Sequence, residues 1–576
     1  MPEGGDKDLT PPRFVGSTPA PNAIHFDKNK ISLEFDEYIS LEKQAENVIV
    51  TPPQKKAPLI KAVGKKITVE LKDTLIPNTT YTFDFTNGIV DFNEKNVLAG
   101  FSFAVSTGDV VDTMMISGLL LNAENLEPMP HVLVGIHSDL SDTAFTRLPF
   151  LRTSQTNGIG QFRIRNVTPG TYHLFALDDK NRDFRFDNAG EAIAFDDSLI
   201  VPTFIPALRM DTIWKDSLTV DTIMEIHYNR FLPDDVILRL FQEDFSTQYL
   251  SKTTRPNHHQ VVMEFNAPVS IEEIPTISAE AILEQSPDRK TMTWWLTDTL
   301  VYRQDTLQIV ADYCASDTLN QLMQMTDTFT LVAKKAPAPK LKKGEVAKPE
   351  KLDITVAPLG TMDVFDTLRI TFSEPLLDFP KEKIRFSQKI DTLWQPRDFP
   401  LVQDALNPRM YYVDTIFPYE QEYQIKIDTA ALTGIYGFVN DSLQVNFKMK
   451  SEKDYAQLFV AVSDNDFAGF GQLLDGSQKV VKQSPLQTGE IVFYDIKPGK
   501  YFLRYIDDAN GNGRWDTGNY AENCQPEAVY YYSGAFDLKA WVELEQNWNV
   551  KAIPIEQQKP LEITKNKPKD NNKNKK

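Results

Sequence analysis

The segment ISLEFDEYI at residues 31–39 predicts the fold of the chain. Its first, third and fifth residues are apolar and alternate with polar ones, which is the period-2 pattern of a β-strand with one face in a core. The same pattern recurs in VVMEFNAPV at 261–269 and in LRITFSEPL at 368–376. Further alternating segments follow each copy, so we predict three copies of one sandwich, named A1, A2 and A3.

A second repeat is independent of the first. The segment NVTPGTYHLFALDDKNRDFRFDNAGE at 166–191 aligns without a gap with DIKPGKYFLRYIDDANGNGRWDTGNY at 495–520. Both contain a Pro-Gly turn, an alternating strand and an Asp-Asp pair in the same order. We name the two modules B1 and B2 and predict the chain order A1, B1, A2, A3, B2.

The fold class predicted from these patterns is all-β, a serial array of small sandwiches. Helical periodicity is scarce, and 36 prolines disfavour long helices. With 576 residues, the chain is long enough for four or more domains at roughly 150 residues each. We expect a flexible N-terminal segment at 1–9, A1 at 10–110, B1 at 111–222, A2 at 223–333, a Lys/Pro-rich linker at 334–351, A3 at 352–450, B2 at 451–555 and a disordered Lys/Asn-rich tail at 556–576.

Composition excludes several classes of protein. Lys plus Arg number 61 and Asp plus Glu number 80, a net charge of −19 that argues against a nucleic-acid binder held by phosphate contacts. No stretch reaches the 18 or so apolar residues of a membrane-spanning helix. Two cysteines, Cys314 and Cys524, exclude a disulfide-rich scaffold and are expected to be isolated thiols.

The B2 loop carries the most specific chemical signal. Oxygen-bearing or turn residues stand at positions 1, 3, 5, 6 and 9 of an EF-hand-type calcium loop, where alternate ligands converge on one cation. The candidate ligands are Asp508, Asn510, Asn512, Asp516 and the carbonyl of Arg514, with Gly513 at the sharp turn. Position 12 is Asn519 instead of glutamate, although Glu522 lies nearby, so we expect weak binding of roughly 10⁻⁴–10⁻³ M.

The B1 loop offers a weaker version of the same site. Its candidate ligands are Asp179, Asn181, Asp183 and Asp187, but Phe184 replaces the glycine and makes the turn harder to form. For both loops the alternative is a set of Asx turns that holds no metal.

Catalytic motifs are absent from the sequence, and we predict that the protein is not an enzyme. It contains no HExxH, GxSxG, phosphate-binding loop or CxxC. Aromatic residues are the other candidates for binding. Trp294 and Trp295 are adjacent in a predicted strand, so one of them points outward unless another domain covers it; the alternatives are packing between domains and a platform for a ligand.

The quoted segments resemble known families. The opening TPPRFVGSTPAPNAIHFDKNKISLEFDEYISL from residue 10, with LIPNTTYTFDFTNGIVDFNEKN at 75–96, resembles the bacterial Ig-like domain of surface-layer proteins and, more closely, the Ig-like lipoproteins of the Bacteroidetes. The segment GQFRIRNVTPGTYHLFALDD at 160–179 resembles the prealbumin-like regulatory module of carboxypeptidases. The resemblance therefore implies Ig-like A modules and prealbumin-like B modules.

The resemblance also implies a cellular location. In that family the mature protein starts at a lipidated cysteine shortly before a Gly-Gly-Pro-Lys-Asp segment, which Gly4-Gly5-Asp6-Lys7-Asp8 approximately matches. It implies a cell-envelope lipoprotein, associated with the outer membrane on its periplasmic or surface face, whose signal and anchor are not in this chain. Membrane contact is then expected only through that lipid anchor.

These observations predict a non-catalytic envelope protein that acts as a scaffold or interaction subunit for outer-membrane or surface proteins. The alternative is a calcium-dependent adhesin or glycan-binding surface protein, in which the B loops and exposed aromatics form the site. Calcium is the one cofactor that the sequence suggests, and nucleic acid is not an expected partner.

Overall fold

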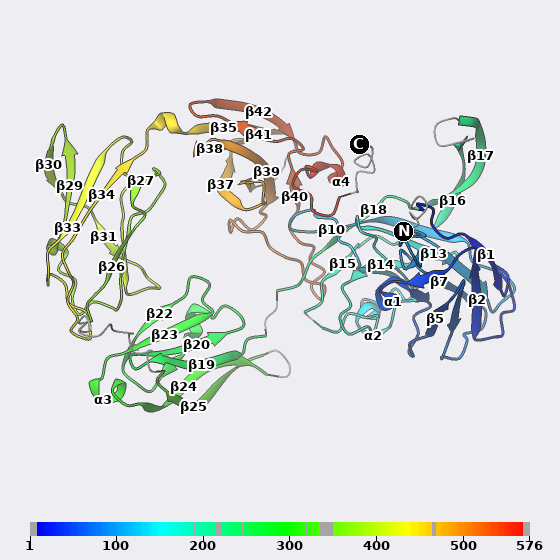
Figure 1. Cartoon of the computed structure of the whole chain (residues 1–576), viewed down its shortest axis with the longest axis horizontal. Helices are drawn as coiled ribbons and strands as arrows, with labels where there is room; N and C mark the ends of the chain where they lie inside the picture. The colour runs from blue at the N-terminus through cyan, green and yellow to red at the C-terminus, as the bar shows by residue number, and fades with distance from the viewer. Residues whose placement is uncertain are drawn as a thin grey trace, which may run out of the picture.

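The structure is a computed structural model that describes residues 8–188, 190–214, 220–244, 247–317, 321–334, 350–463 and 468–567. It is built from short strands arranged in small sheets, as predicted (Figure 1). The α-helices among these residues are single turns, namely α1 (Gln44–Asn47), α2 (Ala144–Arg147), α3 (Thr299–Tyr302) and α4 (Ile555–Gln558). None of the described helices is long and apolar enough to cross a membrane.

The three A modules share one strand order. Each has a four-stranded antiparallel sheet in which the strands run first, second, fourth, third along the chain, and a second sheet packed on it. The four-stranded sheets are β1 (Phe14–Thr18), β2 (Lys30–Phe35), β6 (Lys66–Glu70) and β5 (Leu59–Val63) in A1; β19 (Leu250–Asn257), β20 (Gln260–Phe265), β23 (Thr291–Leu296) and β22 (Ala281–Gln285) in A2; and β26 (Ile354–Ala357), β28 (Arg369–Phe372), β32 (Met410–Val413) and β31 (Leu401–Gln403) in A3.

The second sheets of the A modules share a three-strand unit. They are β4 (Ile49–Thr51), β7 (Thr80–Asp84) and β9 (Ser102–Ser106) in A1; β21 (Thr276–Ile277), β24 (Thr306–Ser316) and β25 (Leu322–Val332) in A2; and β29 (Ile384–Ile390), β33 (Glu422–Ile427) and β34 (Leu443–Met449) in A3, where β30 (Leu393–Arg397) and β27 (Gly360–Met362) extend the two edges. A1 also has a small pair, β3 (Ile39–Leu41) and β8 (Ile89–Asp91).

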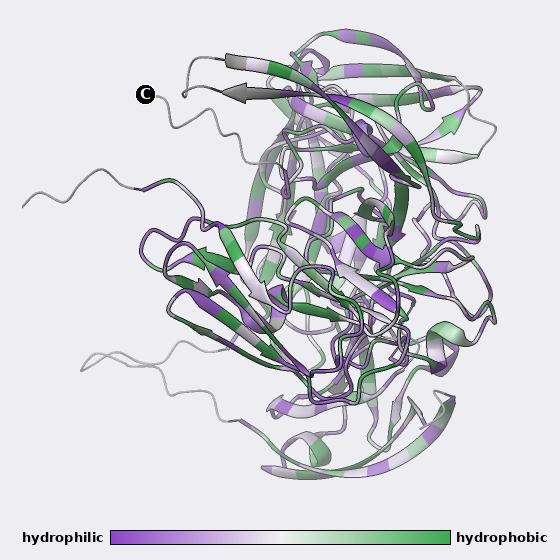
Figure 2. Ribbon diagram, turned by 90° about the vertical axis from the view of Figure 1, so that its right-hand side faces the viewer, coloured by the Kyte–Doolittle hydropathy of each residue, from purple (hydrophilic) through white to green (hydrophobic). Residues whose placement is uncertain are grey.

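The predicted alternation is what builds these cores. Ile31, Leu33 and Phe35 of β2 are buried in the A1 core, whereas Glu34 between them is exposed. The equivalent residues of β20 and β28 are buried in the same way. Hydrophobic and hydrophilic residues alternate along many of the strands (Figure 2). Removing these side chains from water is the main force that holds each module together.

The two B modules also share one strand order. In B1 one sheet contains β13 (Gln161–Val167), β10 (Met114–Asn122) and β18 (Val236–Leu240), and the other contains β12 (Arg152–Gln155), β11 (Leu133–His137), β14 (His173–Leu177) and β15 (Ile193–Phe195). In B2 the first of these orders is repeated by β38 (Glu490–Ile496), β35 (Ala456–Ser463) and β42 (Glu543–Asn549). The second is repeated by β37 (Val480–Gln487), β36 (Gly469–Leu474), β39 (Gly499–Asp507) and β40 (Val529–Tyr531). Pairing of β37 with β38 joins the two sheets of B2, and β41 (Phe536–Leu538) pairs with β39. In each module the last strand pairs in parallel with the first.

The expected start of A2 at residue 223 is corrected by the structure. Strands β16 (Thr203–Trp214) and β17 (Val220–Leu232) pair as a long antiparallel hairpin that projects from B1 (Figure 1). The following strand β18 then completes the B1 sheet, so the first strand of A2 is β19 at 250. The alternation of β17 resembles that of a sandwich strand, although the hairpin belongs to neither core.

The expected disordered tail is also corrected for residues 556–567. These residues include part of helix α4 and side chains that are buried against both B modules, because the few apolar and amide groups there find partners that the sequence does not reveal. Residues 1–7, 335–349 and 568–576, which hold most of the predicted N-terminal segment, the linker and the end of the tail, lie outside the described residues.

The modules are joined by specific contacts. At the A2–A3 junction the Arg409 guanidinium binds both carboxylate oxygens of Glu284 and lies over the ring of Trp295. Trp294 fills the A2 core and Trp295 is covered by A3, so packing is confirmed for both indoles and the ligand platform is not. Cys314 and Cys524 are free, as predicted. After A3 the chain returns, and B2 packs against B1 (Figure 1).

Candidate functional site at the B1–B2 junction

Both predicted loops follow the same strand of their modules. The B1 loop connects β14 to β15 and the B2 loop connects β39 to β40. The sandwich therefore presents its first aspartate, Asp179 or Asp508, at the end of a buried strand. Both loops contribute aromatic side chains to one hydrophobic cluster between the modules.

The B2 loop is organised around Asp508, whose side chain is only 5% exposed. Its two carboxylate oxygens accept hydrogen bonds from the backbone N–H of Asn512 (3.0 Å) and of Gly513 (2.8 Å). Gly511 and Gly513 adopt positive φ angles of 71° and 73°, where glycine has no steric penalty. The predicted sharp turn is therefore present.

The remaining predicted ligands of the B2 loop lie close together. Asn512 donates its side-chain amide to Asp516 (2.6 Å), and the side-chain amide of Asn510 donates to the same carboxylate oxygen. The side-chain oxygen Oδ1 of Asn512 accepts the backbone N–H of Arg514 (2.8 Å). The loop thus satisfies its polar groups internally, as the Asx-turn alternative predicts.

The carboxylate that closes the B2 loop is Glu527, which sequence reasoning missed. It accepts the backbone N–H groups of Ala509 (3.1 Å) and Asp516 (3.0 Å). Burial raises the pKa of Glu527, and these two hydrogen bonds oppose the rise. Glu522, the expected substitute, instead donates its N–H to Asn519 (3.0 Å). The spacing of calcium-loop ligands does not point to residue 527, because residues 517–526 leave the loop before the chain returns to it. We name residues 517–526 the excursion.

The B1 loop forms the same turn without glycine. Arg182 and Phe184 both have φ of 64°, close to the values of Gly511 and Gly513. Phe184 donates its N–H to Asp179 (3.0 Å), and its ring packs at the edge of the aromatic cluster between the modules. This packing offsets the cost of a left-handed phenylalanine, so the turn that we expected to be difficult is present.

An arginine occupies the acidic part of the B1 loop. Arg185 donates to Asp183 (2.8 Å) and forms an ion pair with Asp187 (3.3 Å). Burial opposes ionisation of Asp183, but hydrogen bonds from Arg185 and from Asp187 give it a lowered pKa. The pKa of Asp187 is raised by its hydrogen bond with Asp183. Asn181 joins the group through Asp187 (3.0 Å), so all four predicted residues are brought together.

Glu191 closes the B1 loop as Glu527 closes the B2 loop. One of its oxygens accepts the N–H of Lys180 (3.0 Å), the residue that aligns with Ala509. Glu191 is 0% exposed, its other oxygen has no hydrogen-bond partner, and burial raises its pKa. Across the described ranges, however, no group of three or more His, Cys, Asp or Glu side chains is placed to hold a metal ion. Calcium binding by either loop therefore stays a prediction.

The excursion of the B2 loop docks on B1. Tyr520, which aligns with Glu191, places its ring against four B1 phenylalanines with centroid distances of 5.3–6.3 Å. These are Phe145, Phe175, Phe186 and Phe195. The Tyr520 hydroxyl donates to the carbonyl of Asp142 (2.8 Å), and burial raises its pKa to about 12. An aromatic side chain with a bonded hydroxyl is typical of a specific interface.

Polar contacts fix the same excursion. The Thr517 hydroxyl donates to the carbonyl of Gln242 (2.6 Å), and the Tyr520 N–H donates to the Glu243 carboxylate (2.6 Å). Gln525 donates its side-chain amide to the carbonyl of Phe195 (3.0 Å). The excursion is therefore bound both by core residues of B1 and by Gln242 and Glu243, which follow the last strand of B1.

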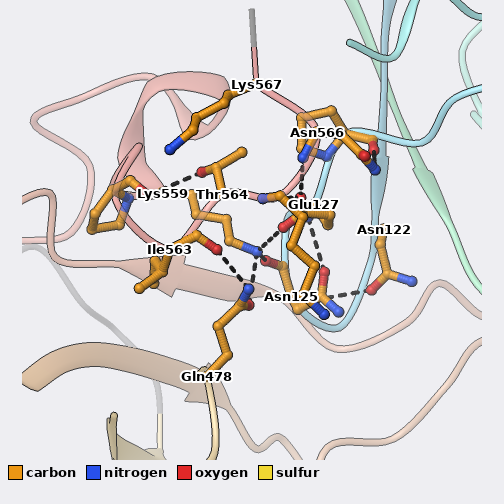
Figure 3. A network of polar contacts seen from close by, with 12 residues as sticks. Asn122, Asn125, Glu127, Gln478, Lys559, Ile563, Thr564, Asn566 and Lys567 are labelled. Atoms are coloured by element: carbon orange, nitrogen blue, oxygen red, sulfur yellow. Dashed lines mark hydrogen bonds and ion pairs between the residues drawn. The ribbon is translucent and has the colours of Figure 1, made fainter. Parts of the chain in front are cut away.

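The C-terminal residues 555–567, named the strap, form a second contact between the modules (Figure 3). Lys559 of the strap forms an ion pair with Glu127 of B1 (2.6 Å), and both side chains are at least 89% buried. The Lys559 ammonium also donates to the carbonyl of Asn125 (2.8 Å) and to Gln478 of B2 (3.0 Å). All three of its N–H groups thus have a partner.

Glu127 is held by the strap backbone as well. Its second oxygen accepts the N–H groups of Lys565 (2.5 Å) and Asn566 (2.7 Å). Burial lowers the pKa of Lys559, and its hydrogen bond with Glu127 opposes that shift. Ile563 of the strap completes an apolar cluster to which both B modules contribute. We name the contacts of Glu127 with Lys559, Lys565 and Asn566 the latch. The latch joins B2 to B1, so that B1, A2, A3 and B2 form a closed ring.

Comparison with known proteins identifies one domain. A model of the bacterial Ig-like domain family matches residues 8–107, which confirms a bacterial Ig-like domain for A1. The closer resemblance to lipoproteins of the Bacteroidetes stays a prediction. No match was found among curated proteins. The resemblance of B1 and B2 to prealbumin-like modules stays a prediction.

Solved structures give a weaker likeness. The major pilin subunit of Bacillus cereus is 8% identical, with a TM-score of 0.14, and the match covers 76% of this chain and 99% of that one. Domains 1–6 of the surface layer protein SbsC are 12% identical, with a TM-score of 0.13, over 92% of this chain and 68% of that one. The Bacillus anthracis TIE protein is 10% identical, with a TM-score of 0.12, over 95% and 76%.

Proposed function

We propose that the protein is a non-catalytic scaffold of the bacterial cell envelope, the ectodomain of a lipoprotein that binds outer-membrane or surface proteins. The observation that carries the proposal is the closed ring of four sandwiches, latched by the strap. A chain of sandwiches joined only end to end is flexible, whereas closure limits how far the four modules of the ring move relative to one another. A scaffold needs such a limit to hold partners in register.

Two further observations support this proposal. Residues 8–107 match the bacterial Ig-like domain, which supports a place on the bacterial surface or in the envelope. The best-formed clusters of polar side chains, at the two B loops and the strap, are filled by the protein's own hydrogen bonds. The polar contacts of the B loops hold each loop in shape, and the Lys559–Glu127 pair fastens the strap to B1, which are structural tasks.

The test is recovery of partners from envelopes. A tagged copy, expressed from its own locus with its native leader, is purified after mild solubilisation, alongside a Glu127→Ala variant that opens the latch. We expect one membrane protein in fixed stoichiometry with the unmodified chain and a lower yield of it with the variant. Recovery of the tagged protein alone would contradict the scaffold proposal.

The second candidate is a calcium-dependent adhesin. The observation that favours it is that Glu191 and Glu527 close the two loops with a carboxylate, as calcium loops require. Trp515 lies inside the B2 loop, so terbium bound there is excited through its indole. Sensitised emission that calcium quenches and that Asp516→Ala abolishes would support the adhesin. Emission that is unchanged by Asp516→Ala would exclude this loop.

A further inference from the structure

A cavity of about 490 Å³ lies between A1 and B1, away from the B1–B2 junction. Its A1 wall is formed by the end of β7, with Asp84, and by Gly100. Its B1 wall is formed by β13 and by the turn that contains Asn157. This volume suits a small molecule of the size of a sugar.

The cavity is held in a fixed shape. The Thr51 hydroxyl of A1 donates to the carbonyl of Thr153 in B1 (3.1 Å), and the Thr82 hydroxyl donates to the side chain of Asn166 (2.9 Å). Asn166 in turn donates to the carbonyl of Asp112 between the modules (2.8 Å). The walls therefore do not need to form when a ligand arrives, which favours binding.

Two arginines of one strand face the cavity. Along β13, Phe162 and Ile164 point into the B1 core, so Arg163 and Arg165 lie on the opposite face and line the cavity. Burial and the neighbouring Arg163 both lower the pKa of Arg165, and Asp84 opposes the shift. Burial raises the pKa of Asp84. The cavity thus holds two cations and one carboxyl group.

The two guanidinium groups are unused by the protein. Among the residues that the structure describes, neither Arg163 nor Arg165 donates a side-chain hydrogen bond or makes an ion pair within 4.0 Å. Arg163 is exposed at the mouth of the cavity and Arg165 is half-buried in its wall. Two neighbouring guanidinium groups without a protein partner favour an oxyanion, which they bind through paired N–H donors.

Neutral polar side chains form another part of the lining, beside apolar residues such as Ile159 and Phe162. Thr86, Asn87, Gln155 and Gln161 contribute hydroxyl and amide groups around the arginines. Asp84 accepts a backbone hydrogen bond from Thr86 (2.8 Å) through one oxygen only. Neutral amides with one carboxyl group are suited to sugar hydroxyls.

We propose that this cavity binds a sugar that carries an oxyanion, with Arg163 and Arg165 on the carboxylate or phosphate and the neutral side chains on the hydroxyls. The inference does not depend on the scaffold proposal, because it concerns a different pair of modules. Its failure would leave the ring unaffected.

The experiment is calorimetric titration of the full chain with glucuronate, glucose 6-phosphate and glucose at millimolar concentrations. We expect at least one of the two anions to bind about tenfold more tightly than glucose, and the stronger of the two identifies the oxyanion. No binding of either anion, or equal binding of glucose, would overturn the proposal.

Variants locate the site. Arg163→Gln combined with Arg165→Gln is expected to weaken anion binding about tenfold or more. Thermal unfolding should be unchanged, because neither guanidinium has a partner to lose. The matched control, Arg147→Gln, removes an exposed arginine of B1 outside the cavity and should leave binding as it was. Full affinity in the double variant, or an equal loss in the control, would show that the anion binds elsewhere.

Discussion

B1 and B2 have the same strand order but opposite roles where they meet. At one aligned position B1 has Glu191, which closes its own loop, and B2 has Tyr520, which packs into the partner module. In B2 the closing carboxylate comes seven positions later, at Glu527, after the excursion that docks on B1. B2 therefore contributes the protruding segment at this contact, named the insert, and B1 contributes the surface that binds it.

This difference shows how a duplicated sandwich becomes a joint. The strands were kept because their alternating residues fill a core, and any change there costs stability. The loop between β14 and β15, or β39 and β40, is free to lengthen since it lies at the end of the sheet. The loop is longer in B2 than in B1, and the added residues contact B1 of the same chain.

The largest effect is expected from breaking the latch. Glu127→Ala leaves the Lys559 ammonium buried without its partner, which should cost about 3–5 kcal/mol at the junction. Calorimetry of the full chain, with hydrogen exchange at the Tyr531 amide that donates to Gln558 of the strap, measures the loss.

Two controls interpret that result. Glu562→Ala removes a surface ion pair of the same strap, with Lys500, and should cost less than about 1 kcal/mol. Glu127→Leu combined with Lys559→Met should restore most of the stability, because neither charge is then buried alone. Equal losses in Glu127→Ala and Glu562→Ala would contradict the latch.

Removing the insert should have the next largest effect. Tyr520→Ala empties the space between four phenylalanine rings and is expected to cost about 3 kcal/mol. Tyr494→Ala, which removes an exposed tyrosine of B2, is the control and should cost less than about 1 kcal/mol. Thermal unfolding of the full chain compares the two, and a similar shift in both variants would mean that Tyr520 does not anchor the junction.

Mild acid is expected to destabilise B1 more than B2. Burial lowers the pKa of His137 in B1 to about 4, and the residue is 2% exposed, whereas B2 contains no histidine. The unfolded chain takes up this proton near pH 6.5 and the folded one only near pH 4, so B1 loses stability as the pH falls through that range.

The expected loss for B1 is about 2 kcal/mol between pH 7 and pH 5. Hydrogen exchange, resolved by module, measures it. His137→Phe should remove the dependence, and His227→Asn, on the exposed hairpin, should not. Equal sensitivity of B1 and B2 in this range would contradict the prediction.

The smallest effect compares the two turns. Gly511→Ala places a side chain at φ 71° and should destabilise the B2 loop by about 1 kcal/mol, although nothing lies within 4 Å of the new Cβ. Arg182→Ala at the matching B1 position should change stability by less than about 0.5 kcal/mol, because that residue already has φ of 64°. Thermal unfolding of each variant measures the difference, and equal losses would show that the turns are not equivalent.

The fold was predictable because its signal is local. Alternation at Ile31, Leu33 and Phe35 and the gapless alignment of 166–191 with 495–520 specify strands and copies without knowledge of their neighbours. The family model that matches residues 8–107 agrees with the resemblance found for A1. The four B1 residues and five B2 residues predicted for the loops are indeed brought together, although no metal site is formed among the described residues.

The junction was not predictable because its signal is not local. Tyr520 stands in a polar loop and Lys559 in a lysine-rich segment of a composition typical of disorder. Tyr520 is half-buried and Lys559 is buried, in each case against a module more than 300 residues away in the sequence. The prediction that placed part of the hairpin of β16 and β17 in A2 was wrong for the opposite reason. The residues of β17 alternate like those of a core strand, although the hairpin packs into no core.

The most direct test of the closed ring is the distance between B1 and B2 in solution. The native exposed thiol of Cys524, on the insert, takes one spin label, and Asp197→Cys on B1 takes the other, in a chain with Cys314→Ser. We expect one short, narrow distance distribution that broadens and lengthens in Glu127→Ala. A broad, long distribution in the unmodified junction would contradict closure, and with it the proposal that this chain is a rigid scaffold.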